Sequence, residues 1–271
     1  MWAATRRSRL VCLSAAGYHA LHGRTEAVRA ALIADVHANL VAFEAVLAHA
    51  RDQGGFDEVW CLGDIVGYGP RPAECIDLLR QHPHRAVAGN HDLAACGELG
   101  VEDFNDAAAR AALWTRATLD DERKRWLASL PHVERAGDFT LVHGTLRSPI
   151  WEYLLSERQA ADQLARQETP YSAVGHSHIP FVAVARRTGG VSLRPVEPDE
   201  TVTLGEARAI VNPGGVGQPR DGDPRAAYAL YDSDTRVVRF FRVPYDIAAT
   251  QRQMEEARLP RWLIDRLAYG R

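Results

Sequence analysis

Five short blocks of the sequence are rich in side chains that bind metal ions. They combine aspartate, asparagine and histidine, and they are Asp35-Val36-His37, Gly63-Asp64, Gly89-Asn90-His91-Asp92, His143-Gly144 and Gly175-His176-Ser177-His178. Carboxylate and amide oxygens and imidazole nitrogens are ligands that divalent cations accept in proteins. Four blocks follow apolar runs typical of β-strands, and the remaining one follows the shorter run 85–88. Ligands that recur where strands end predict a metal site on the rim of a sheet, and therefore an enzyme.

The types and order of these side chains suit two metal ions. Asp35 and His37 lie two residues apart on a strand end and its turn, so both can face one ion. Asp64 ends the neighbouring strand and is placed to bridge two ions. The amide oxygen of Asn90 is a neutral ligand, which suits a site already rich in negative charge. Three histidines can then complete two coordination spheres: His143, His176 and His178.

Two such ions favour hydrolysis of a phosphate ester. When they are ~3.5–4 Å apart, they can hold the attacking and the leaving oxygen of an in-line displacement at phosphorus, and they lower the pKa of a bridging water. Hydroxide bound to the two ions is therefore the expected nucleophile. The leaving alkoxide still needs a proton. His91 is placed to donate it as general acid, with Asp92 available to orient the ring of His91.

The first half of the chain predicts the elements that position these blocks. Residues 28–34 and 58–62 are expected strands, and helical spacing of apolar residues follows each of them. Residues 85–88 are a short third strand, and residues 103–130 are expected to be helical. Strands that alternate with helices predict a parallel sheet with helices on its faces. Ligands bind such sheets beyond the carboxyl ends of the strands, where all five blocks lie.

The second half of the chain predicts further strands. Residues 181–185 and 191–196 are expected to pair in a hairpin around Gly189-Gly190. Other short apolar runs typical of strands lie at residues 139–142, 172–174, 209–211, 227–231 and 237–241. Together with the hairpin they form a second, largely antiparallel set. Because the metal-binding blocks span both halves, residues 28–271 are expected to form one domain with two packed sheets.

The two ends of the chain lead to different expectations. Asp246 can cap a last helix, which runs towards Leu267 with one break at Pro260. This helix is a candidate contact surface for a homo-oligomer. At the other end, the apolar patch within residues 1–27 is too short for a signal peptide. We expect this segment to be a disordered extension or a mis-called start.

Composition and charge argue against several classes of partner. The 271 residues carry a formal net charge of −3, and the isoelectric point is ≈ 6.4. These values argue against a surface that binds polyanions, and they give little support to a nuclease activity. No apolar run reaches the length of a membrane span. The cysteines lack a CxxC spacing and fit a reducing, cytoplasmic setting; they are Cys12, Cys61, Cys75 and Cys96.

The five blocks together resemble the motifs of the calcineurin-like metallophosphoesterase superfamily, which are DxH, GD, GNHD/E, H and GHxH. Residues 63–70, 141–144 and 212–220 are similar to its small bacterial and archaeal phosphodiesterase branch. The resemblance covers residues 29 to 245. It implies an α/β fold, a four-layer α-β-β-α sandwich in which helices flank two packed mixed sheets. The sequence departs from the branch at Gly215, where serine is more frequent, and this puts only local loop contacts in doubt.

The resemblance also implies a role for each motif residue. One ion would take Asp35, His37, Asp64 and His178 as ligands. The other would share Asp64 and would also take Asn90, His143 and His176. His91 would be the catalytic acid, and both Asn90 and His91 would contact the substrate. Mn²⁺ is the ion expected first, while the ligand types leave Fe, Zn and Ni open.

The expected activity is that of a metal-dependent phosphodiesterase, with alternatives that the sequence leaves open. A phosphomonoesterase, including one that acts on phosphoserine and phosphothreonine of proteins, needs the same ligands. A non-catalytic scaffold of the same fold would be expected to lack His91. Arg147 and Arg220 are candidate phosphate ligands, although arginines on a rim are more often solvated. Specificity is expected to lie in the loops around Tyr68, Trp151 and residues 97–118, with Trp151-Glu152-Tyr153 as a candidate cap over the pocket.

Overall fold

The computed structural model describes residues 27–271, so the expectation for the N-terminal extension lies outside the described residues. Its first sheet has the strand order β3 (His84–Ala86), β2 (Glu58–Cys61), β1 (Arg29–Ile33), β11 (Ala226–Asp232), β12 (Val237–Val243) and β9 (Thr201–Thr203). β1, β2 and β3 are parallel to one another, while β11, β12 and β9 extend this sheet by antiparallel pairing. The first sheet is therefore mixed.

The second sheet is mixed as well. Its order is β4 (Val133–Ala136), β5 (Phe139–Val142), β6 (Tyr171–Ala173), β10 (Ala209–Asn212), β7 (Phe181–Ala185) and β8 (Val191–Pro195). β5, β6 and β10 are parallel, and antiparallel strands flank them on both sides. The expected hairpin is confirmed, because Ala185 of β7 pairs with Val191 of β8 on either side of the Gly189-Gly190 turn.

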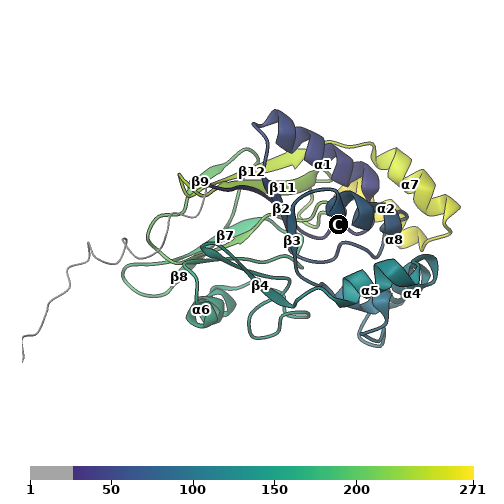
Figure 1. Cartoon of the computed structure of the whole chain (residues 1–271), viewed down its shortest axis with the longest axis horizontal. Helices are drawn as coiled ribbons and strands as arrows, with labels where there is room; N and C mark the ends of the chain where they lie inside the picture. Colours follow the sequence, from purple (N-terminus) through teal and green to yellow (C-terminus); the bar gives the residue numbers. More distant parts are fainter. Residues whose placement is uncertain (1–26) are drawn as a thin grey trace, which may run out of the picture.

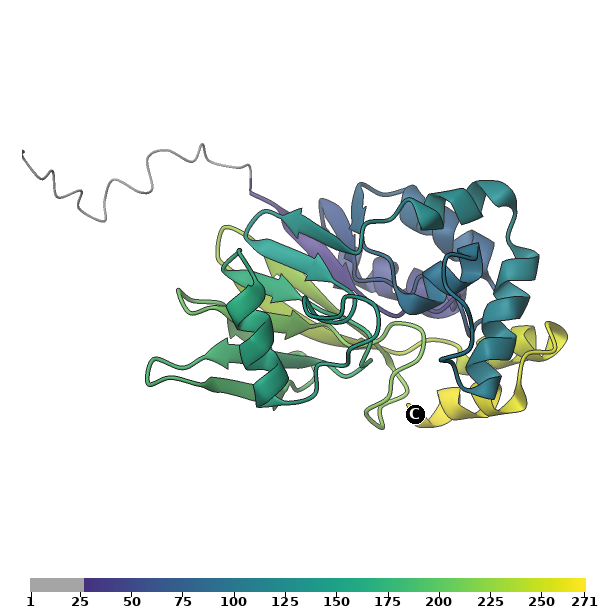
Figure 2. The ribbon, with the colours of Figure 1, turned by 90° about the horizontal axis from the view of Figure 1, so that it is seen from below.

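The four-layer sandwich is confirmed, and Figure 1 shows its layers in order. α1 (Leu40–Asp52) and α2 (Pro72–Arg80) cover the outer face of the first sheet, and α6 (Glu157–Arg166) crosses the outer face of the second (Figure 2). Alternation along β1 explains the layering: Ala31 and Ile33 pack among the residues under α1, whereas Leu32 points into the core between the sheets. Trp60, Phe139 and Phe240 fill that same inner core.

The remaining helices gather beyond one end of the sheets. They are α3 (Asn90–Cys96), α4 (Asp106–Thr118), α5 (Asp121–Ala128), α7 (Ile247–Glu256), α8 (Arg261–Asp265) and a 3₁₀ turn (Arg266–Tyr269). Asp246 caps α7 as expected, since its carboxylate accepts the Ala249 N–H at 2.8 Å. Within residues 27–271, no helix combines the length and the apolar character needed to cross a membrane.

The structure corrects the predicted organisation at three points. The strands at 226–232 and 237–243 belong to the first sheet, because β11 pairs directly with β1. The expected helix over 103–130 is two helices, because the first ends at Thr118 and the Asp120 carboxylate caps the second by accepting the Arg123 N–H. The strand expected at 85–88 stops at Ala86, and the chain turns from there into α3.

Candidate metal centre

All seven predicted metal ligands converge beyond the carboxyl ends of the strands. Asp35 and His37 follow β1, Asp64 follows β2, and Asn90 opens α3 after β3. From the second sheet, His143 directly follows β5, and the 175–178 loop follows β6. The two sheets thus present their loops to one shared rim. All seven side chains are buried: Asp35, His37, Asp64, Asn90, His143, His176 and His178.

The backbone of these loops is conformationally demanding. Five of the seven candidate ligands adopt a positive φ of 48 to 65°, and they are Asp35, His37, Asp64, His176 and His178. Residues other than glycine rarely adopt this left-handed conformation, and such strain concentrates at functional sites. Backbone hydrogen bonds hold the loops in this conformation. The Gly63 carbonyl accepts the Asp35 N–H, and the Asp64 carbonyl accepts the His37 N–H. The fold therefore imposes the direction of these side chains.

Asp35, His37 and His178 form the first ligand group. Nε2 of His37 lies 3.1 Å from Nε2 of His178, which in turn lies 3.4 Å from Oδ1 of Asp35. A neutral imidazole has one N–H. In both rings the Nδ1 side faces a backbone carbonyl, that of Val66 for His37 and that of Gln218 for His178. The proton of each ring therefore lies on Nδ1, and two Nε2 lone pairs face each other. A cation bound between the two nitrogens would account for this contact.

The second group repeats this arrangement with Asn90, His143 and His176. His143 donates its Nδ1–H to the Leu62 carbonyl at 2.7 Å, and His176 donates its Nε2–H to the Trp151 carbonyl at 3.2 Å. The other nitrogens of the two rings lie 3.0 Å apart, and the Asn90 Oδ1 lies 3.2 Å from the His143 Nε2. Two nitrogen lone pairs and a carbonyl oxygen therefore converge. Carbonyls that fix the ring tautomers in this way are typical of metal sites.

Asp64 lies between the two groups. Its Oδ2 is 3.7 Å from the His37 Nε2 and 3.5 Å from the His143 Nε2. Its Oδ1 accepts the backbone N–H of His91 at 2.9 Å, which fixes the carboxylate. Gly89 permits this close approach, since a Cβ there would lie 2.1 Å from Oδ1 of Asp64. Asp64 can therefore serve both groups at once.

The electrostatics of these residues fit a divalent cation. Burial lowers the pKa of His37 and His178 well below the usual range, and it lowers that of His143 to about 4, so the rings are neutral ligands. Burial also raises the pKa of Asp64 to about 7, and it raises that of Asp35 with further help from the Asp64 charge. The buried Oδ2 of Asp35 has no hydrogen-bond partner among residues 27–271. A cation would pair this orphaned oxygen and stabilise both carboxylates.

His91 lies beside the two ligand groups and lines the pocket. Its ring packs against Tyr68, His37 and Phe104. A Cβ on Gly67 would lie 2.4 Å from the His91 Nδ1, so this nitrogen faces the backbone of Gly67. The Nδ1 is buried and has no hydrogen-bond partner in the described part of the chain. The other ring nitrogen, Nε2, is therefore the one left for a group in the pocket that His91 lines, where a general acid would act.

The expected contact between Asp92 and the His91 ring is not formed. The carboxylate of Asp92 instead accepts two backbone N–H groups, from Gly89 at 3.0 Å and from Val66 at 3.1 Å. The Gly89 bond caps α3, and the Val66 bond ties this helix to the loop that carries Asp64. Asp92 thus holds the backbone around the segment that carries His91.

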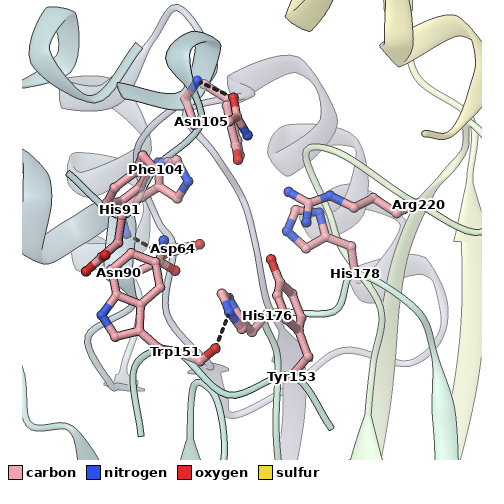
Figure 3. A pocket seen from close by; sticks show the side chains of 13 residues that line it. Asp64, Asn90, His91, Phe104, Asn105, Trp151, Tyr153, His176, His178 and Arg220 are labelled. Carbon is pink, nitrogen blue, oxygen red and sulfur yellow. Dashed lines mark hydrogen bonds between the residues drawn. The ribbon is translucent and has the colours of Figure 1, made fainter. Parts of the chain in front are cut away.

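An open pocket lies in front of the ligands, and Figure 3 shows its lining. Tyr68, Phe104, Trp151 and Tyr153 form an aromatic wall, and the ring of Tyr153 stacks on that of His176 with centroids 4.0 Å apart. The loops expected to carry specificity do border the pocket. The sequence did not single out Phe104 or Asn105, which line it as well, because residues 103–130 were expected to be helical. Asn105 caps α4, because its side-chain oxygen accepts the Ala108 N–H. An asparagine before an alanine-rich run is typical of a helix start, and this signal could have placed Asn105 in the loop before the helix.

The two candidate arginines differ in position. Arg220 lines the pocket, and it is the only arginine or lysine among the described residues that do so. Arg147 lies outside the lining, and its guanidinium is paired with Glu152, whose Oε2 accepts the Arg147 Nε–H at 3.0 Å. A guanidinium engaged by a carboxylate has fewer donors for a phosphate. The geometry therefore favours Arg220 and gives Arg147 a structural role.

Comparison with known proteins identifies the family. Residues 28–236 match the calcineurin-like phosphoesterase superfamily domain. The chain belongs to the calcineurin-like phosphoesterase superfamily. This phosphoesterase is 36% identical over 246 residues to an uncharacterized protein of Methanocaldococcus jannaschii, a match that covers 89% of this chain and 98% of that protein. The crystal structure of a metallophosphoesterase from Sphaerobacter thermophilus is similar, with a TM-score of 0.81 and 47% identity over 91% of this chain and 100% of that chain.

A more distant likeness covers less of the phosphoesterase. The symmetrical bis(5'-nucleosyl)-tetraphosphatase of Psychromonas ingrahamii is 30% identical over 125 residues, which are 44% of this chain and 45% of that protein. Family membership makes this protein a hydrolase that acts on phosphate esters, and the superfamily uses divalent metals. The buried histidine and aspartate groups are the residues of this chain that could hold such ions.

Proposed function

We propose that this phosphoesterase is a phosphodiesterase with a dinuclear metal centre, for which Mn²⁺ is the first ion to test. The observation that carries the proposal is the pair of imidazole contacts at 3.1 and 3.0 Å, one on each side of Asp64, in which lone pairs face each other. Two cations bound there would lower the pKa of a water to supply the nucleophile and would neutralise charge on the phosphoryl group. One ion would take Asp35, His37 and His178, the other Asn90, His143 and His176.

The chain's own residues supply the remaining parts of the reaction. His91 lines the pocket, and its Nε2 would hold the proton that the leaving oxygen takes. Burial, followed by the charge of Arg220, lowers the pKa of His91 well below its usual range. Arg220 and the Asn90 side chain would bind oxygens of the phosphoryl group. Asp92 would keep His91 and Asn90 in position through its two backbone bonds.

The substrate class follows from the shape and lining of the pocket. An aromatic wall beside the metal ligands suits an ester whose substituent carries a flat ring. Small nucleotides have this chemistry, and the partial likeness to tetraphosphatases that act on bis(5'-nucleosyl) substrates supports testing them. The alternative of a phosphomonoesterase, including one acting on phosphoproteins, uses the same ligands and differs in substrate only. A non-catalytic scaffold is disfavoured by the presence of His91 with every ligand. A cytoplasmic location stays a prediction.

The deciding experiment compares bis-p-nitrophenyl phosphate with p-nitrophenyl phosphate, on protein first freed of metal by a chelator and then given Mn²⁺. We expect the diester to be hydrolysed with the higher kcat/KM, and chelated protein to be inactive on both esters. Preference for the monoester would contradict the proposal and favour the phosphomonoesterase alternative. Failure to hydrolyse either ester, with two ions bound, would favour the scaffold. Diadenosine tetraphosphate and cyclic nucleotides are the natural substrates to test after a positive result.

A further inference from the structure

Gln218 makes a different contact at each of its two ends. Its backbone carbonyl accepts the Nδ1–H of His178, which fixes the tautomer of that candidate ligand. Its side-chain Oε1 accepts two N–H groups of Arg220, from Nε at 3.2 Å and from Nη2 at 3.0 Å. The residue is only 1% exposed. One buried residue therefore touches both a candidate metal ligand and the arginine of the pocket.

The orientation of the Gln218 amide is set by Arg220. A guanidinium has donors only, so the amide must turn its oxygen towards Arg220. Its Nε2 then faces away, and it is buried without a hydrogen-bond partner in residues 27–271. Buried polar atoms are normally paired, and an exception calls for an explanation. The contact with Arg220 is formed although it leaves the amide N–H groups of Gln218 without a partner among the described residues.

Arg220 is held in a way that leaves its binding edge free. Gln218 occupies the side edge of the guanidinium, formed by Nε and Nη2. The guanidinium also lies over the ring of Tyr68, with its carbon 5.9 Å from the ring centroid. Arg220 forms no ion pair with a described carboxylate, unlike Arg147, which pairs with Glu152. The end edge, formed by Nη1 and Nη2, therefore keeps N–H donors in the fork geometry that matches two phosphate oxygens.

We propose that Gln218 is a positioning residue that aims the end edge of Arg220 at the phosphoryl group of the substrate and ties this arginine to the loop that holds His178. The inference rests on the proposed phosphoesterase function and deepens it. Gln218 touches no reacting atom in this account. Its effect on the reaction passes through Arg220, whose contact with non-bridging oxygens contributes to substrate binding as well as to the transition state.

The test replaces Gln218 by methionine, which keeps the length of the side chain and the backbone carbonyl to His178 but removes the acceptor oxygen. For bis-p-nitrophenyl phosphate with Mn²⁺ we expect kcat/KM to fall about tenfold, the size of one charge-assisted hydrogen-bond pair, mainly through a higher KM. Bound Mn²⁺ and the circular dichroism spectrum should stay as in the wild type. Gln167→Met is the matched control, because Gln167 is also buried and its amide bonds the Thr169 and Pro170 carbonyls.

A double-mutant cycle separates positioning from a general structural effect. If Gln218 acts through Arg220, then Gln218→Met should cause no further loss in an Arg220→Met protein. A full additional tenfold loss in that background would overturn the proposal, and so would a Gln218→Met enzyme with wild-type kcat/KM.

Binding of inorganic phosphate to the Mn²⁺-loaded protein, measured by calorimetry, tests the proposal without turnover. Weaker binding by Gln218→Met than by Gln167→Met would uphold the positioning role even if the wild type hydrolysed no ester, in which case the proposed function alone would fail. Equal binding by the two variants would overturn the positioning role.

Discussion

At the scale of single residues, the direction of each imidazole lone pair carries the functional argument. Each of four backbone carbonyls accepts the ring N–H of one histidine; they belong to Val66, Gln218, Leu62 and Trp151. The nitrogens that remain free converge on two points beside Asp64. Sequence alone predicted which residues come together at the rim, because their types and their places at strand ends are visible there. It could not predict which ring nitrogen binds, because the carbonyls that decide this lie on other loops.

The first prediction concerns His91. Replacing it by alanine removes the candidate general acid but leaves every ligand in place. We expect kcat to fall by about 10² to 10⁴-fold, the usual contribution of a positioned acid, with unchanged Mn²⁺ content. Rates on bis-p-nitrophenyl phosphate and metal analysis of the purified variant measure the two effects. A turnover close to that of the wild type would remove His91 from the mechanism.

The second prediction concerns Asp64. Asparagine at this position keeps the size of the side chain but removes the negative charge that is 3.7 Å from His37 and 3.5 Å from His143. We expect both ions to bind more weakly, because one carboxylate serves both groups. Calorimetric titration of the metal-free protein with Mn²⁺ would record this weakening. Two fully occupied sites in Asp64→Asn would rule out the bridging role.

At the scale of elements, the loop between β5 and α6 builds one wall of the pocket. Glu152 organises this loop, since its carboxylate accepts hydrogen bonds from Arg147, Thr145 and Gln159. The bonds from Arg147 lower the pKa of Glu152 to about 2. The loop places the Trp151 carbonyl within hydrogen-bond distance of the His176 Nε2, and it stacks the Tyr153 ring on the His176 ring. Glu152 thus stabilises a candidate ligand without touching it.

The third prediction follows from this lowered pKa. Because it lies below the ordinary value of 4.5, ionised Glu152 stabilises the fold above pH 4.5, and this contribution is lost as the pH falls towards 2. Glu152→Gln should therefore lower the free energy of unfolding at pH 7 by about 1 kcal/mol, a value that allows for solvent screening. The difference from the wild type should shrink at pH 3. Urea unfolding at the two pH values measures it, and an equal difference at both would contradict the prediction.

The fold also shows which elements can be inferred from sequence. Strands with clear periodicity, such as β1 and β5, lie within a residue of the predicted ranges 28–34 and 139–142. α3 was missed because its first residues, Gly89-Asn90-His91-Asp92, resemble a turn, and the capping bond from Gly89 to Asp92 becomes visible only in the structure. The place of β11 beside β1 was also missed. Periodicity reveals a strand but not its partner, which the packing of distant segments decides.

At the scale of the whole molecule, two sheets are needed to complete the site. The first sheet contributes Asp35, His37, Asp64 and Asn90, and the second contributes His143, His176 and His178. A shared apolar core between the sheets, which includes Trp60 and Phe139, fixes the spacing of their rims. Neither sheet alone holds either complete ligand group. Metal binding at these residues would therefore be coupled to the packing of the entire sandwich.

The fourth prediction uses this coupling. Ions that bind only the folded protein stabilise it, by about 2.7 kcal/mol at a concentration 100 times the dissociation constant. For a protein of this size, that corresponds to a rise in Tm of roughly 5 to 10 °C. Calorimetric melting of chelated protein with and without Mn²⁺ measures the rise, which Asp64→Asn should reduce. An unchanged Tm at saturating Mn²⁺ would contradict the prediction that the ions bind only the folded protein.

The most direct test of the dinuclear centre is X-ray diffraction from crystals of the Mn²⁺-loaded protein, recorded at the manganese absorption edge. Two anomalous peaks are expected on either side of Asp64, ~3.5–4 Å apart as in other two-metal sites. One should lie among Asp35, His37 and His178, and the other among Asn90, His143 and His176. A single peak, or peaks away from these side chains, would contradict the account.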